Sequence, residues 1–117
     1  MTGLIAFNRI LRRTPGFLTE GRPRRGCMRI QAALAGGVEN EQIRKRLIVL
    51  RVKEQAALRR QFERARSEGD LSRDADAADL ARFVSALLQR MTVQAIDGAS
   101  CKDLLRLSDT ALRIWPK

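Results

Sequence analysis

Apolar residues recur along this chain at spacings of three, four and seven, and no stretch alternates with a period of two for long enough to form a strand. The pattern predicts an all-α fold of about five helices. The first three helices are expected over residues 4–13, 26–35 and 40–67.

Residue types that begin or end helices set these boundaries. Pro15, followed by Gly16, should end the first helix and begin a loop over residues 14–25. Asn40 is the expected N-cap of the third helix. The apolar stripe of that third helix consists of Ile43, Leu47, Leu50, Ala57, Leu58, Phe62 and Ala65.

Two further helices are expected towards the C-terminus. Asp76 and Ser100 each precede an aspartate by three residues, which is typical of helix N-caps, while Gly98 and Pro116 should end the two helices. Both helices carry apolar residues on more than one face, which is more apolar surface than a small domain covers alone. We therefore expect a homodimer that pairs these helices into a four-helix interface. The expected interface residues are Phe83, Arg90, Gln94, Leu104, Leu107, Ala111 and Trp115.

The composition of this 117-residue chain, which has the size of one domain, excludes several kinds of chemistry. Without histidine, the chain supplies neither a Ser–His or Cys–His nucleophile pair nor an imidazole metal ligand. It also lacks a phosphate-binding loop, a CxxC pair and a complete calcium-loop pattern. We therefore expect no enzyme activity, no cofactor and no metal site. Cys27 and Cys101 fit a reducing compartment and are expected to be small apolar residues, with a redox pair as the less favoured alternative.

The net charge of +10 is concentrated in the first part of the chain. Residues 1–30 carry seven arginines and one glutamate, whereas residues 70–117 carry seven charges of each sign. We therefore divide the chain into a basic segment, residues 1–25, with one short helix and a loop, and a domain over residues 26–117. The arginines of the basic segment are candidates for non-specific contacts with nucleic-acid phosphates, although a solvated basic surface explains them more simply. They are Arg9, Arg12, Arg13, Arg22, Arg24 and Arg25.

The apolar runs are also too short for a membrane protein. None approaches the roughly 20 residues that span a bilayer, and the N-terminus lacks the pattern of a secretory signal. We therefore expect a cytoplasmic protein with no membrane partner.

Several segments resemble the C-terminal domain of TetR-type bacterial transcriptional regulators. Residues 26–34, GCMRIQAAL, resemble the "GCL-V-NAAL" helix of that domain, and residues 59–116 resemble its last three helices, with "LARF" at 80–83 and "DGAS" at 97–100. Arg29 departs from the pattern where the family has an apolar residue, and Gln31 departs where it has asparagine.

The resemblance implies a ligand-responsive regulator. In that family the C-terminal domain binds a small effector, the last two helices form the homodimer, and a separate N-terminal helix-turn-helix module binds operator DNA. Only 25 residues precede Gly26, too few for that module, so we expect the sensing and dimerisation part without the DNA-reading part. A small basic helical nucleic-acid-binding protein and the product of a truncated or mis-started gene are the alternatives.

Such a domain should hold its effector, a small apolar or amphipathic molecule, between the second, third and fourth helices. Glu54 and Gln61 lie on the apolar stripe of the third helix and could contact the polar part of an effector, but ordinary partly exposed helix positions are the favoured explanation. Met28 and Phe83 fit a pocket and a core equally. The expected pocket residues are Met28, Gln31, Leu34, Leu50, Glu54, Phe83 and Leu87.

Overall fold

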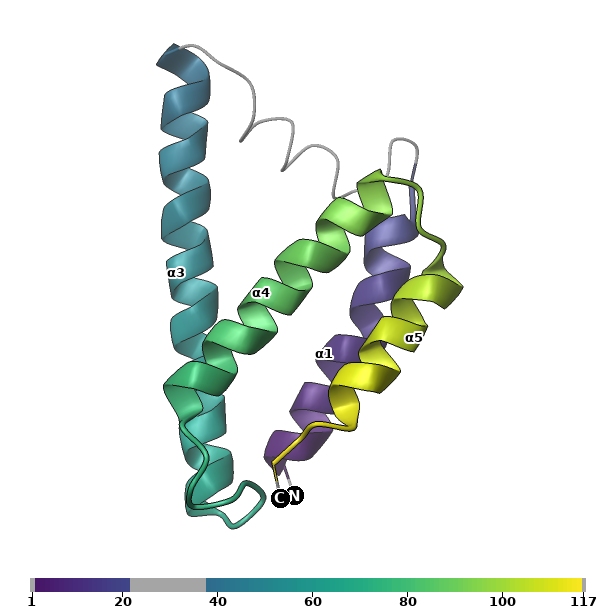
Figure 1. Ribbon diagram of the computed structural model, residues 1–117. Helices are drawn as coiled ribbons and strands as arrows, with labels where there is room; N and C mark the ends of the chain where they lie inside the picture. Colours follow the sequence, from purple (N-terminus) through teal and green to yellow (C-terminus); the bar gives the residue numbers. More distant parts are fainter. Residues whose placement is uncertain (1, 22–37, 117) are drawn as a thin grey trace.

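The computed structural model describes residues 2–21 and 38–116, which form helices and no strand, so the predicted all-α class is confirmed (Figure 1). The expected helix over residues 26–35 lies outside the described residues, as does the boundary between residues 25 and 26. No helix in the described part of the chain is both long and apolar enough to cross a membrane. The helices are α1 (Thr2–Thr19), α3 (Val38–Ser67), α4 (Ala77–Ile96) and α5 (Cys101–Leu112).

The helices pack as two pairs. α1 packs most extensively on α5, and α3 packs most extensively on α4. Figure 1 shows α1 and α5 side by side, with α4 crossing from the lower end of α3 to the upper end of that pair. Fewer contacts join α1 to α3 and α4. The two pairs therefore form two parts of one bundle.

A proline inside α1 gives the first pair a specific link. The prediction that Pro15 ends the helix is wrong, because α1 continues through Pro15 to Thr19. Proline has no N–H, so the carbonyl of Leu11, four residues earlier, lacks its usual donor within the helix. The hydroxyl of Ser108 on α5 donates a 2.6 Å hydrogen bond to this carbonyl, and Leu11, Pro15 and Ser108 are all fully buried. α1 can therefore contain Pro15, because Ser108 of α5 supplies the hydrogen-bond donor that the proline lacks.

An ion pair lies one residue further along both helices. Nη2 of Arg12 is 3.2 Å from Oδ1 of Asp109, close enough for attraction but without the geometry of a hydrogen bond. Both side chains are about half exposed, so this pair contributes at most about 1 kcal/mol to stability. The buried Ser108 bond is the stronger determinant of how α1 meets α5.

Three aromatic rings join the two pairs at the end of the bundle where α1 begins. Phe7 of α1 lies 4.9 Å from Trp115 and 6.0 Å from Phe62 of α3, and Phe62 lies 5.7 Å from Trp115, all measured between ring centroids. Ring pairs at these separations stabilise a core beyond the area that they bury. The indole N–H of Trp115 donates a 3.0 Å hydrogen bond to the carbonyl of Asp70, which fixes the chain after α5 to the turn after α3.

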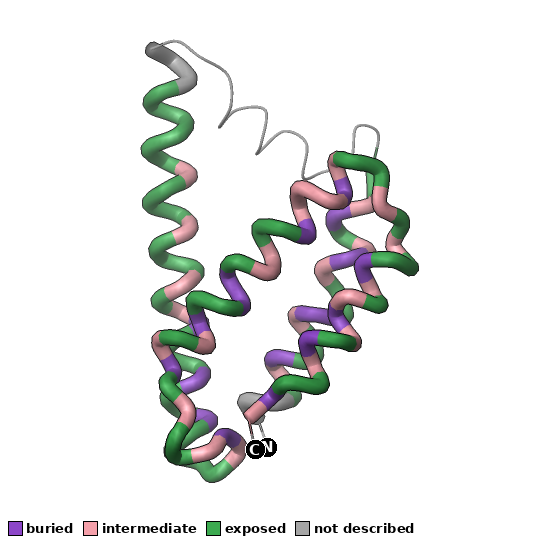
Figure 2. The backbone as a smooth tube through the Cα atoms, in the orientation of Figure 1, coloured by how far each residue is buried: buried purple, intermediate pink, exposed green. Residues whose placement is uncertain are grey.

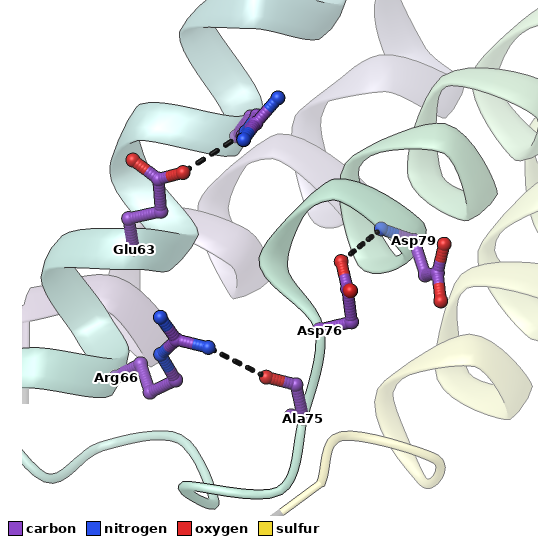
Figure 3. A network of polar contacts seen from close by, with 6 residues as sticks. Glu63, Arg66, Ala75, Asp76 and Asp79 are labelled. Atoms are coloured by element: carbon purple, nitrogen blue, oxygen red, sulfur yellow. Dashed lines mark hydrogen bonds and ion pairs between the residues drawn. The ribbon is translucent and has the colours of Figure 1, made fainter.

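That turn brings α4 back along α3. Gly69 adopts a φ of 86°, which favours glycine, and the N–H of Asp70 donates to the carbonyl of Ala65. The guanidinium of Arg66 donates to the carbonyl of Ala75 at 3.3 Å, next to the start of α4 (Figure 3). The predicted cap is confirmed, since the carboxylate of Asp76 accepts a 3.0 Å hydrogen bond from the N–H of Asp79. By contrast, α3 begins at Val38, so the predicted cap at residue 40 is wrong.

The start of α5 matches the sequence prediction closely. The hydroxyl of Ser100 accepts from the N–H of Asp103, and the carboxylate of Asp103 accepts from the N–H of Ser100, so both halves of a capping box are present. Hydrogen bonds from Ser100, first that of its backbone N–H, lower the pKa of Asp103 below its ordinary value. The helix ends at Leu112 rather than at Pro116, which lets Trp115 turn into the aromatic cluster.

The two halves of α3 differ in how far their side chains are buried. Leu58, Phe62 and Ala65 are buried in the core, as the apolar stripe predicts. Ile43 and Leu50 of the same stripe are exposed, and Figure 2 shows this first half of α3 as almost entirely exposed. The apolar stripe is therefore buried only towards the end of α3, where Leu58, Phe62 and Ala65 join the core.

The substitution Ser108→Ala tests the link between α1 and α5. It leaves the Leu11 carbonyl buried without a donor, so we expect the free energy of unfolding to fall by about 1–3 kcal/mol. The substitution Pro15→Ala restores an N–H within bonding range of that carbonyl and should reduce the cost of Ser108→Ala. Urea unfolding of the two single variants and the double variant measures this coupling. The exposed Ser67, whose hydroxyl bonds within its own helix, is the control, and Ser67→Ala should change stability by less than about 0.5 kcal/mol. An equal cost of Ser108→Ala with and without Pro15 would contradict this account.

Candidate functional site

A cavity of about 630 Å³ lies where α1 faces α3 and α4. This volume is within the range of roughly 300–1,000 Å³ that is typical of small-molecule sites. Leu18, Leu58 and Ser85 line it as buried residues, whereas Phe17 and Glu54 are exposed and lie at its rim. The lining residues are Ile10, Thr14, Phe17, Leu18, Arg51, Glu54, Ala57, Leu58, Gln61, Ser85, Leu88, Gln89, Thr92 and Val93.

The helical repeat places each group of lining residues on one face of its helix. On α1, Ile10, Thr14 and Phe17 are spaced by four and three residues, and so face the cavity together. The neighbouring Leu11 bonds to Ser108 on α5 instead. α1 therefore contacts the cavity with one face and α5 with another.

The polar groups of the α4 wall are ordered by hydrogen bonds. The amide nitrogen of Gln89 lies 3.3 Å from the hydroxyl oxygen of the buried Ser85, to which it donates. The hydroxyl of Thr92 donates to the carbonyl of Leu88 at 3.0 Å. Across the cavity, the hydroxyl of Thr14 donates to the carbonyl of Ile10 at 2.7 Å. The wall thus combines apolar surface with a few oriented polar groups, as small-molecule sites usually do.

Two opposite charges lie on the α3 wall. Arg51 is half-buried and Glu54 is exposed, and the two are three residues apart, which places them on the same side of the helix. The described lining therefore carries one positive and one negative side chain.

The structure places some of the expected pocket residues on this lining and others elsewhere. Glu54 and Gln61 line the cavity. Leu50 lies one turn before Glu54 in the exposed half of α3, and Phe83 is two residues from Ser85, on nearly the opposite face of α4, so neither is on the lining. Leu87 is half-buried against the apolar core. The remaining expected residues, Met28, Gln31 and Leu34, lie outside the described residues.

Sequence analysis missed the contributions of α1 and α4. Thr14 and Phe17 lie in the segment around Pro15, which the sequence predicts to be a loop and which the structure shows as part of α1. On α4, the signal was present, because Ser85, Gln89 and Thr92 repeat at four and three residues and so form one polar stripe between apolar positions. A polar stripe of this kind on an apolar helix indicates a face that does not belong to the dry core.

The expected interface residues divide into two groups. Leu104, Ala111 and Trp115 are buried within this chain, where α1 contributes Phe7, Leu11 and Leu18 to the same apolar clusters. The others lie nearer the surface: Phe83 and Arg90 are exposed, and Gln94 and Leu107 are half-buried.

The basic and sulfur-containing candidates lie apart from the cavity. Arg9, Arg12 and Arg13 are exposed on α1, and Arg12 pairs with Asp109, whereas Arg22, Arg24 and Arg25 lie outside the described residues. Cys101 is half-buried at the start of α5, and Cys27 lies outside the described residues, so their pairing stays a prediction. Among the residues that the structure describes, no cluster of acidic, cysteine or histidine side chains could hold a metal ion.

Comparison with known proteins finds relatives by sequence and by structure. The sequence model of the tetracyclin repressor-like C-terminal domain matches residues 5–97. The HTH-type transcriptional repressor ComR of Escherichia coli (strain K12) is 33% identical over 51 residues, which are 44% of this chain and 24% of that repressor.

Two solved structures of the TetR family transcriptional regulator CifR share the fold. A cysteine mutant bound to 26-bp operator DNA superposes with a TM-score of 0.86 at 32% identity, covering 97% of this chain and 59% of that one. A second mutant, described with operator DNA and in its apo form, gives 0.85 at 34% identity and covers 97% and 60%. This chain therefore spans about three-fifths of the solved relatives and about a quarter of the curated one.

The substitution Ala57→Phe tests whether the cavity is open space in solution. A phenyl group at this half-buried position can enter the cavity, so we expect the free energy of unfolding to change by less than about 1 kcal/mol. Ala65→Phe is the matched control, because Ala65 is fully buried in the core, where overpacking should cost about 1–3 kcal/mol. Chemical denaturation compares the two variants. Equal destabilisation by both would show that the cavity is filled.

Proposed function

Since this chain belongs to the family of tetracyclin repressor-like C-terminal domains, we propose that it is the effector-sensing and homodimerisation domain of a TetR-like transcriptional regulator. The observation that carries the proposal is the cavity between α1, α3 and α4, which is large enough for a small organic molecule and combines apolar walls with ordered polar groups. The solved neighbours are bound to operator DNA. Control of operator DNA is accordingly proposed for the regulator to which this domain belongs.

α1 is the element through which an effector acts in this proposal. Its residues Ile10 and Thr14 line the cavity, and its residue Leu11 bonds to Ser108 on α5. A ligand that occupies the cavity favours the position of α1 that contacts it best, and α5 follows because the buried hydrogen bond holds the two helices together. The ligand shifts this equilibrium only by the difference between its affinities for the two arrangements.

The outer face of α4 supplies the proposed dimer surface. Leu80, Phe83, Leu87, Arg90 and Gln94 repeat at three and four residues, the spacing of a seam between two packed helices. None of these five residues lines the cavity. Leu80 and Leu87 are half-buried against the core, whereas Phe83 exposes 43% of its surface. Half-buried Leu107 and exposed Ile114, seven residues apart, extend it onto the last part of the chain.

Introducing a charge into the seam tests the dimer. We expect the wild-type chain to sediment as a dimer, and Phe83→Glu to raise its dissociation constant at least about tenfold, because the carboxylate would be buried in an apolar contact. Val52→Glu is the control, since Val52 is an exposed apolar residue on α3, outside the seam, and should leave the dimer unchanged. Sedimentation equilibrium measures all three proteins. A monomeric wild-type chain, or equal effects of the two substitutions, would contradict the proposed interface.

A further inference from the structure

We propose that the cavity selects an uncharged amphipathic molecule that carries a hydrogen-bond donor, such as the hydroxyl group of a long-chain alcohol or an alkylphenol. This inference rests on the proposed function of the cavity as a ligand site and concerns the chemical class of its ligand. Three features of the lining lead to it: the threonine hydroxyls, the balance of charge and the apolar walls.

The two threonine hydroxyls can only accept hydrogen bonds from a ligand while their present bonds persist. A hydroxyl has one hydrogen to donate and two lone pairs to accept. Thr14 donates its hydrogen to the Ile10 carbonyl at 2.7 Å, and Thr92 donates its hydrogen to the Leu88 carbonyl at 3.0 Å. Both threonines are half-buried and line the cavity from different helices, so their oxygens present acceptors from α1 and from α4.

A ligand group that binds between α1 and α4 should therefore carry a hydrogen-bond donor. A hydroxyl or phenol can donate to a threonine oxygen, whereas an ether or ester of the same size presents only acceptors, and paired acceptors repel each other. The neighbouring Ser85 already accepts from Gln89, which uses one of the amide hydrogens of Gln89 within the wall. Around the two threonine oxygens, a ligand group that donates is consequently better matched than one that only accepts.

The charges of the lining favour an uncharged ligand. Arg51 and Glu54 lie one turn apart on the same face of α3 and are opposite in sign. A carboxylate or an ammonium group that left water to enter the cavity would meet both charges together, without a net countercharge to compensate for its lost hydration. An uncharged polar group loses much less hydration, so it enters at lower cost.

The cavity lining also provides an apolar surface that the apolar part of the ligand can contact. Seven apolar side chains from three helices surround the same space, and two of them, Leu18 and Leu58, are buried. An alkyl chain or an aromatic ring buried against them gains roughly 25 cal/mol per Å² of surface removed from water. The seven residues are Ile10, Phe17, Leu18, Ala57, Leu58, Leu88 and Val93.

A pair of isomers tests the donor requirement directly. Straight-chain decanol and methyl nonyl ether have the same formula and one oxygen each, but only the alcohol can donate. Isothermal titration calorimetry on the full chain should show decanol binding about tenfold more tightly than the ether, the equivalent of one hydrogen bond. Decanoate and decylammonium, tested alongside, should bind more weakly than decanol.

A double variant tests whether the two threonine hydroxyls cause the preference for decanol over the ether. In the double variant Thr14→Val, Thr92→Val, which keeps the side-chain shape without the hydroxyls, decanol and the ether should bind within about twofold of each other. Thr110→Val is the control, because Thr110 donates to the Arg106 carbonyl in the same way but is exposed on α5, away from the cavity. That variant should keep the full preference for decanol. Circular dichroism melting confirms that each variant is folded before titration.

The possible results separate this inference from the proposed function. If neither isomer binds at any concentration up to saturation, the cavity is not a ligand site and both fail. If both isomers bind wild type equally, or if decanoate or decylammonium binds more tightly than decanol, the cavity remains a ligand site and the inferred ligand class is wrong. A preference for decanol that survives in the double threonine variant would likewise overturn the assignment.

Discussion

Pro15 leaves one carbonyl group of α1 without a partner in its own helix, and the arrangement of the bundle follows from how that carbonyl is satisfied. A proline inside a helix usually costs about 3 kcal/mol or more through the lost hydrogen bond and the displaced backbone. Here the hydroxyl of Ser108 replaces the missing donor from a different helix, 97 residues away in sequence. Leu11, Pro15 and Ser108 are all buried. If α1 moved away from α5, the buried carbonyl of Leu11 would therefore lose its hydrogen-bond donor, which is costly.

This constraint explains why the cavity lies on the other side of α1. With α1 held on α5 and α3 held on α4, the two pairs meet where Phe7, Phe62 and Trp115 pack together. They meet again in a second buried cluster, where Leu18 and Leu104 pack with Met91 and Ala95 of α4. Further along α1, the side chains at residues 10, 14 and 17 face α3 and α4 across the cavity instead of closing onto them. One helix thus carries both the link to α5 and part of the wall of the candidate site, which is the physical basis for the proposed communication between effector and dimer.

Features that depend on neighbouring residues in the chain could be predicted from the sequence. The caps at Asp76 and Ser100 form as expected, because the donor and acceptor lie three residues apart and need no other part of the molecule. The family was also predictable, since its short segments recur in order over most of the chain. Glu54 and Gln61 were singled out because polar residues interrupted an apolar stripe, and both line the cavity.

Features that depend on packing between distant segments could not be predicted in the same way. Periodicity shows that Leu104 and Trp115 prefer burial, but it does not show whether α1 or a second copy covers them, and α1 does so. Nor could the sequence show that Ser108 would complete the hydrogen bonding of Leu11, which allowed the helix to continue past Pro15 and made Thr14 part of the cavity. Exposure of the first half of α3 likewise depends on which elements lie beside it.

Everything proposed for this domain requires a small molecule to bind in the space between the two helix pairs. Nuclear magnetic resonance of the chain with labelled isoleucine, leucine and valine methyl groups, titrated with decanol, tests it most directly. We expect nuclear Overhauser contacts from the ligand to the methyl groups of Ile10 and Val93, which line the cavity from α1 and α4. Contacts confined to Ile48 and Val49, on the exposed half of α3, would contradict it, because they would place the ligand on the outer surface.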